Sequence, residues 1–236
     1  MFQLNNTNLA INRKFAINMT IIPTNILYIH GMGGGGDSRI PRLLKEQMDD
    51  VQVIVRTYSF DPEIAANQIA AWMEELHPAL VIGESLGSIH ALRLGGVPHL
   101  FVSPSLGAPK YLYTLSFLAY IPGVPRLCGW IWHPREGDRQ QLIFRPEILR
   151  KYRNHEKAAL AHIREHGQED LYFAFFGTRD HYRRSGVVSV RLWEKYFGKE
   201  SYKLYEGTHF MEETYVSALL IPKIREILIA KIAENA

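Results

Sequence analysis

The stretch ALVIGESLGSIHAL, residues 79–92, says more about the fold than any other part of this chain. Its first four residues are apolar and partly β-branched, as in a strand buried on both faces. Apolar residues then recur at helical spacing from Ser88 to Leu94. Gly83 and Gly87 flank Ser85, and glycine tolerates the strained angles and close backbone approaches of a sharp strand-to-helix turn. The pattern predicts a nucleophile elbow, which raises the Ser85 hydroxyl above the sheet. The alternative is an ordinary glycine-rich turn between a strand and a helix.

Strand and helix patterns alternate along the rest of the chain. We expect strands at 25–29, 51–58, 79–82, 99–102, 171–176 and 201–205, and helices at 38–49, 61–76, 88–94, 185–197 and 211–233, the last broken near Pro222. Alternation at this spacing predicts the α/β class, with a mostly parallel sheet of about six strands and helices on both faces.

The segment 105–170 separates two of these strands by far more than one helix requires. It opens with the apolar, aromatic run YLYTLSFLAYIPGVP, residues 111–125. Prolines, a glycine and Arg126 interrupt the run well short of the ~20 apolar residues of a membrane-spanning helix. We therefore predict a helical cap insertion over the carboxyl edge of the sheet, and a transient contact with a membrane surface stays open. The candidate substrate-pocket residues in the cap are Tyr111, Tyr113, Phe117 and Tyr120.

The composition is that of a globular protein, with 47% hydrophobic and 22% charged residues among 236. We expect a single domain over 19–236, preceded by a poorly ordered extension over 1–18, with Met19 as a candidate start. The N-terminal residues lack the apolar core of a secretory signal, and Cys128 is the single cysteine, so we expect a cytoplasmic protein without an internal disulfide. The net charge of +3 is too small, and the arginines too interspersed, to indicate nucleic-acid binding.

A serine nucleophile needs a base, and the base needs an acid that orients it. Among ten histidines, His209 alone follows the last expected strand, in a turn that opens the final helix. Asp180 follows the preceding strand, which gives the chain order Ser, Asp, His. Alternatively, Asp180 caps the next helix or pairs with Arg183 or Arg184.

Other acids fit the role less well. Glu206 is a weaker substitute for Asp180, Asp170 precedes its strand, and Asp138 lies in the expected cap.

An acyl-transfer reaction also needs N–H donors for the oxyanion. The backbone of Leu86, directly after Ser85, supplies one at a helix N-terminus. A second is expected from the glycine-rich loop HGMGGGG, residues 30–36. Such a loop could also hold a phosphate, but no Gly-Lys-Ser/Thr follows it. A dinucleotide site, with Asp61 as its acidic residue, is a weak alternative because a run of glycines satisfies almost any glycine pattern.

The motifs IHGMGG, GESLG, FGTRD and GTHF, each at the end of an expected strand, resemble those of the α/β-hydrolase superfamily. The resemblance spans 25–236 apart from the insertion, and the short chain looks like the compact bacterial esterase-type members. It implies that the backbone N–H of Met32 is the second oxyanion donor. Two features depart from the family: its usual first two strands are missing or reduced to 9–22, and the cap matches no particular branch.

These residues together predict a serine hydrolase of the carboxylesterase or thioesterase type. In this hypothesis Ser85 attacks a small-molecule ester or thioester with an apolar acyl group, and no metal or organic cofactor takes part. An acyltransferase would use the same triad, and a catalytically silent binding protein could use the same fold.

Overall fold

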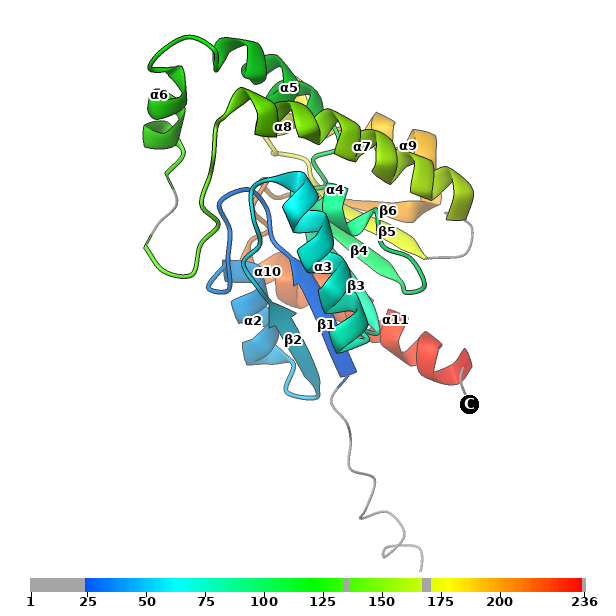
Figure 1. Ribbon diagram of the computed structural model, residues 1–236. Helices are drawn as coiled ribbons and strands as arrows, with labels where there is room; N and C mark the ends of the chain where they lie inside the picture. Colours follow the sequence, from blue (N-terminus) through cyan, green and yellow to red (C-terminus); the bar gives the residue numbers. More distant parts are fainter. Residues whose placement is uncertain (1–23, 134–135, 167–170, 235–236) are drawn as a thin grey trace, which may run out of the picture.

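The computed structural model describes residues 24–133, 136–166 and 171–234 (Figure 1). The expected extension over 1–18 lies outside these ranges. Six strands form one sheet in the order β2-β1-β3-β4-β5-β6, and every neighbouring pair is parallel. The strands are β1 (Thr24–Ile29), β2 (Val51–Val55), β3 (Leu80–Glu84), β4 (His99–Val102), β5 (Tyr172–Gly177) and β6 (Tyr202–Tyr205). The predicted α/β class and parallel sheet are confirmed.

Helices connect the strands. They are α2 (Arg39–Gln47), α3 (Pro62–Leu76), α4 (Gly87–Ala91), α5 (Ala108–Leu118), α6 (Val124–Ile131), α7 (Pro146–His166), α8 (Tyr182–Ser185), α9 (Val190–Phe197), α10 (Glu213–Tyr215) and α11 (Ile221–Glu234). A 3₁₀ turn at Lys199–Ser201 precedes β6, and a π-helical segment at Val216–Leu220 joins α10 to α11.

The core lies on both faces of the sheet because successive side chains of a strand point to opposite sides. In β1, Leu27 and Ile29 belong to the cluster that packs against α3, α4, α7 and α9. Ile26 and Tyr28, which alternate with them, belong to the cluster that packs against α2 and α11. All four side chains are almost fully buried, as a strand covered on both faces requires.

Two boundaries differ from the sequence-based expectation by three residues or more and have a clear local cause. β2 ends at Val55 instead of residue 58 because its partner strand is short. Val55 pairs with Tyr28, and β1 ends at the next residue, Ile29. The helix expected at 185–197 begins at Val190, because Gly186 has a left-handed φ of 78° and the Ser189 side chain caps α9.

The final helix is not broken at Pro222. The Ile221 N–H donates to the carbonyl of Val216, five residues back, so the wide π turn lies just before the proline. A wider turn gives the proline ring room where an ordinary α-helix would clash with it.

The segment between β4 and β5 holds α5, α6 and α7. Figure 1 shows α5 and α6 standing at one end of the molecule, on the side to which the arrowhead of β1 points. α7 packs along α5 and also contacts α3 and α4. The stretch between α6 and α7 reaches the first loop of the fold through a bridge between Gly35 and Arg139. That this segment acts as a cap stays a prediction.

Candidate active site

Ser85 sits in a strained turn directly after β3. Its φ is +50°, a left-handed angle that a serine adopts only where surrounding structure imposes it. A Cβ on Gly87 would lie 2.3 Å from the carbonyl oxygen of His30, and one on Gly83 would lie 3.0 Å from the Cα of Ser88. Close backbone approach therefore requires a glycine at 87 and makes any side chain at 83 a tight fit, as the sequence pattern predicted.

Three side chains from distant parts of the chain meet at this turn. The Oγ of Ser85 lies 2.9 Å from Nε2 of His209. The other ring nitrogen of His209, Nδ1, lies 2.8 Å from Oδ2 of Asp180. The side chains of His209 and Asp180 are 4% and 0% exposed, whereas Ser85 is only partly buried. The carboxylate accepts from Nδ1–H, so Nε2 is left as the acceptor that faces the serine hydroxyl.

Asp180 also caps the next helix, the role that the sequence left open as an alternative. Its Oδ1 accepts a hydrogen bond of 2.8 Å from the backbone N–H of Tyr182, at the start of α8. The two oxygens thus serve two partners at once, and the N–H of Tyr182 holds the carboxylate in position for the imidazole. Arg183, by contrast, donates to the carbonyl of Gly177.

The other candidate acids lie elsewhere. The Asp138 carboxylate accepts from the Thr57 hydroxyl. Glu206 is exposed, and its backbone carbonyl accepts from Arg179 and Tyr215. Asp170 lies outside the described residues.

The glycine-rich loop after β1 lies against the serine. A Cβ on Gly31 would be 3.0 Å from the Cβ of Ser85 and 3.5 Å from its Oγ. The N–H groups of Gly33, Gly34 and Gly35 all have acceptors. Within the described part of the chain, the N–H groups of Met32 and Leu86 have none. Their role as oxyanion donors stays a prediction.

Two neighbours of the site, Ser105 and Gln140, escaped the sequence analysis. The Oγ of Ser105, after β4, lies 3.2 Å from the Oγ of Ser85, and the Ser105 N–H donates to the Ser85 carbonyl. The buried side chain of Gln140 accepts from the Gly33 N–H through Oε1, and the backbone N–H of Gln140 donates to the carbonyl of Gly34. Gln140 therefore fixes the loop that carries Met32. No local sequence pattern marks either residue, since each acts across a long chain separation.

Glu84, the residue before Ser85, accepts a 2.8 Å hydrogen bond from the Tyr28 hydroxyl. Burial raises the pKa of the Glu84 carboxyl, while this bond and the nearby His209 act in the opposite direction. The side chain lies on the face of the elbow away from α4, with the α2 side of the core. In the sequence, Glu84 is only the first variable position of the Gly-x-Ser-x-Gly motif, so the pattern did not predict this role.

The aromatic residues predicted to line the pocket are exposed. Tyr111, Tyr113, Phe117 and Tyr120 are between 39% and 55% exposed. Phe117 and Tyr120 lie beside the Arg150 guanidinium of α7, at 5.1 and 5.0 Å from their ring centroids. Nearer to the triad, the rings of Tyr182 and Phe210 lie 4.7 and 5.1 Å from the His209 ring.

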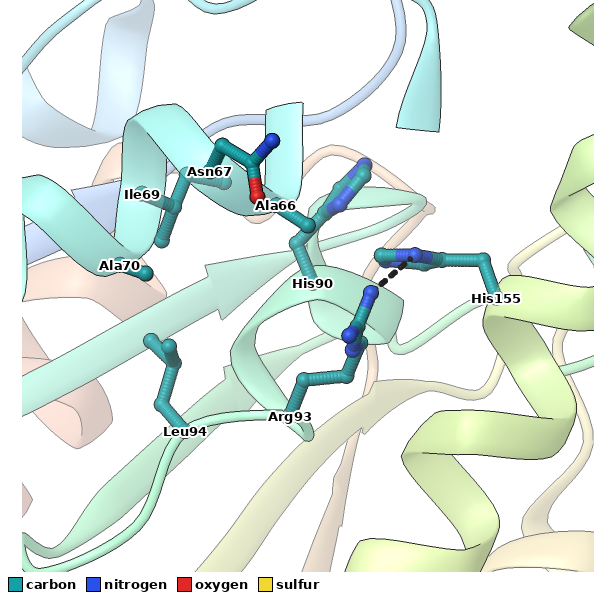
Figure 2. Close-up of a pocket in the computed structure, with 8 residues that line it drawn as sticks. All are labelled: Ala66, Asn67, Ile69, Ala70, His90, Arg93, Leu94 and His155. Atoms are coloured by element: carbon teal, nitrogen blue, oxygen red, sulfur yellow. Dashed lines mark hydrogen bonds between the residues drawn. The ribbon is translucent and has the colours of Figure 1, made fainter. Parts of the chain in front are cut away.

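A separate cavity of about 140 Å³ lies among α3, α4 and α7 (Figure 2). Arg93 donates to Nδ1 of His155 at 2.8 Å, so the other nitrogen of that ring carries its proton. Burial is the largest cause that lowers the pKa of His155, to about 3, and that of His90 well below its ordinary value. His90 packs edge-on to Tyr58, which stacks on His30 in the loop after β1. Together these rings form a buried, uncharged cluster between α4 and the loop after β1.

No group of three or more His, Cys, Asp or Glu side chains within the described ranges is placed to hold a metal ion. Across the same ranges, no helix is long and apolar enough to cross a membrane.

No protein-family model matches the chain, and a search of curated proteins finds no match. One similar solved structure is a variant of tomato methylketone synthase I in complex with β-ketoheptanoate. The similarity covers 91% of this chain and 99% of that one, with 12% identity and a TM-score of 0.47, and nothing about substrate follows from it. The chain's own parallel sheet, its elbow after β3 and the order Ser, Asp, His are those of the α/β-hydrolase fold.

Proposed function

We propose that this α/β-hydrolase-fold protein is a serine hydrolase that cleaves carboxylic esters or thioesters through an acyl-enzyme on Ser85. The observation that carries the proposal is the pair of hydrogen bonds that joins Ser85 to His209 and His209 to Asp180, at 2.9 and 2.8 Å. Those distances are within the reach that proton transfer between a nucleophile and its base requires. The left-handed φ of Ser85 supports the same conclusion, since backbone strain of this kind is kept at functional sites.

The mechanism follows from these positions. The Ser85 Oγ attacks the substrate carbonyl while its proton passes to Nε2 of His209, and Asp180 stabilises the imidazolium. The carbonyl oxygen becomes an oxyanion, which accepts hydrogen bonds from the N–H groups of Met32 and Leu86. When the tetrahedral intermediate collapses, the carbon–oxygen or carbon–sulfur bond breaks and His209 protonates the leaving group. Water then attacks the acyl-enzyme by the same steps and releases the acid.

An apolar acyl group fits the surroundings of the triad. Met32, Tyr182 and Phe210 are 39%, 37% and 56% exposed around the serine and histidine, so they offer apolar surface to a substrate. Covering such surface with an acyl chain is favourable by about 25 cal/mol per Å². Hydrolysis of p-nitrophenyl esters should therefore become more efficient from acetate to octanoate. Equal or falling kcat/KM along that series would contradict an apolar acyl site.

Labelling with a fluorophosphonate probe tests the catalytic role directly, because the probe reacts only with an activated serine. Wild type should label, while Ser85→Ala and His209→Ala should not. His133→Ala, which removes an exposed histidine outside the triad, is the matched control and should label like wild type. Asp180→Asn should slow labelling by about 10³- to 10⁴-fold, since triad members act as a unit. A folded wild type that fails to label, or Ser85→Ala that still labels, would refute the proposal.

A further inference from the structure

Exposed apolar side chains in the described part of the chain are concentrated in one segment, which holds α5 and α6. Among the residues that the structure describes, ten of the eighteen exposed large hydrophobic side chains lie between Tyr111 and Trp132, on α5, the turn after it, α6 and its C-cap. We call these ten side chains the α5–α6 face. The most exposed of them is Trp130 at 74%, and Tyr120, Ile121 and Leu127 are each more than half exposed.

Scattered exposed apolar residues are normal in a folded protein, but ten of them within one segment of 22 residues indicate an interaction surface. The packing of α5 and α6 shows that the exposure is not a failure of these helices to fold. Leu112, Ala119 and Cys128 from the same segment are buried in the main core. The helices are therefore anchored by one side, and the apolar residues on the other side have no core to enter.

The charged side chains of the segment that holds α5 and α6 are all positive. Residues 108–133 contain Lys110 and Arg126, both exposed, and no aspartate or glutamate. Arg150 adds a third positive charge, held over the rings of Phe117 and Tyr120. A surface that combines exposed tryptophan and tyrosine with lysine and arginine has the chemistry of the membrane interface. There, aromatic rings sit at the level of the headgroups and basic side chains attract anionic lipids.

The position of the α5–α6 face also suits a membrane. Figure 1 shows α5 and α6 at the end of the molecule toward which β1 points, which is the edge of the sheet where Ser85 lies. The α5 helix begins close to Ser85. Ser105 contacts Ser85, and α5 begins three residues after Ser105. A membrane in contact with this face would lie on the same side of the molecule as the catalytic edge.

We propose that the α5–α6 face docks this protein on the surface of membranes that contain anionic lipid. The apolar rings enter the interface between headgroups and acyl chains, and Lys110, Arg126 and Arg150 contact the anionic headgroups. No segment needs to cross the bilayer in this mode of binding. The docking does not depend on the chemistry of Ser85. It would place the protein where an ester carried by a lipid could reach the candidate active site.

Flotation of the full chain with lipid vesicles tests the proposal. Wild type should float with vesicles of phosphatidylcholine mixed with phosphatidylglycerol, less with phosphatidylcholine alone, and less again in high salt, which screens the headgroup charge. Trp130→Glu should weaken partitioning by roughly tenfold or more, because it removes the most exposed ring and adds a repelled charge. Ile229→Glu is the matched control, since this residue is 66% exposed on α11, outside the α5–α6 face. It should float like wild type.

A second pair of variants separates charge from apolar contact. Lys110→Glu with Arg126→Glu should reduce binding to the anionic vesicles and leave the weak binding to phosphatidylcholine unchanged. Wild type that binds neither kind of vesicle would overturn the proposal, as would Trp130→Glu that binds as well as wild type. A wild-type dimer that Trp130→Glu converts to a monomer, without vesicle binding, would show instead that the face joins two copies of the chain. Fluorophosphonate labelling in the absence of lipid reports on Ser85 separately, so the docking and the hydrolase proposals can fail independently.

Discussion

Buried uncharged histidines should make this protein unfold in mild acid. Burial is the main cause that holds the pKa of His30 at about 4 and those of His99 and His155 at about 3. In the unfolded chain a histidine has a pKa near 6.5. The unfolded state therefore binds protons first as the pH falls, and stability that is fully present above about pH 6.5 is lost between that pH and the folded values.

The size of the effect follows from these values. At pH 5 each ring favours the unfolded state by about 2 kcal/mol, because one pKa unit corresponds to about 1.4 kcal/mol. The three together amount to about 6 kcal/mol, a large part of the ~5–15 kcal/mol that stabilises a typical domain. His90, whose pKa is also lowered by burial, acts in the same direction. The raised pKa of Glu84 acts in the opposite direction above pH 4.5, so a single substitution is a cleaner test than the absolute curve.

His99→Phe is that substitution. The His99 ring is fully buried beside the rings of Tyr172 and Phe101, with centroids 5.0 and 6.1 Å away, so a phenyl ring fits its surroundings. The free energy of unfolding, measured by urea denaturation followed by circular dichroism, should fall by about 2 kcal/mol less between pH 8 and pH 5 than in wild type.

Phe176→Leu is the matched control, because it disturbs the same core without changing a titrating group. It should lower stability by a similar amount at every pH. Equal pH slopes for wild type and His99→Phe would show that His99 is protonated in the folded state, and the reasoning from burial would be refuted.

Two further predictions concern the elbow and its neighbours. Gly87→Ala should destabilise the fold by about 3 kcal/mol, because the new Cβ would meet the His30 carbonyl at 2.3 Å. Gly129→Ala, in α6 with open space around it, should instead stabilise the fold by about 0.5–1 kcal/mol. If thermal unfolding showed Gly87→Ala to be more stable than Gly129→Ala, the close approach at Gly87 would be refuted. Ser105→Ala should lower kcat by about tenfold with little change in KM, since it removes the hydroxyl 3.2 Å from the Ser85 Oγ. An unchanged kcat in ester hydrolysis would restrict Ser105 to a structural role.

The sequence by itself determined the elements whose causes are local. Gly83, Ser85 and Gly87 predict the strained turn after β3 because glycine spacing and apolar patterning act within a dozen residues. The alternation of strands and helices predicts the parallel sheet for the same reason. His209 and Asp180 could be selected because parallel strands bring the loops at their carboxyl ends to one edge. The catalytic roles of these residues are still predictions.

Only the tertiary structure decided which groups meet across long separations in the chain. It gave Asp180 two partners at once, brought Ser105 to the Ser85 hydroxyl, and set Gln140 as the support of the glycine loop. It also showed that Tyr111, Tyr113, Phe117 and Tyr120 are between 39% and 55% exposed, and that these residues line a substrate pocket stays a prediction. A sequence pattern records which side chains are apolar and how they are spaced along one element. Whether such a side chain faces a core, a substrate or the solvent depends on what packs against that element, and only the folded chain contains this information.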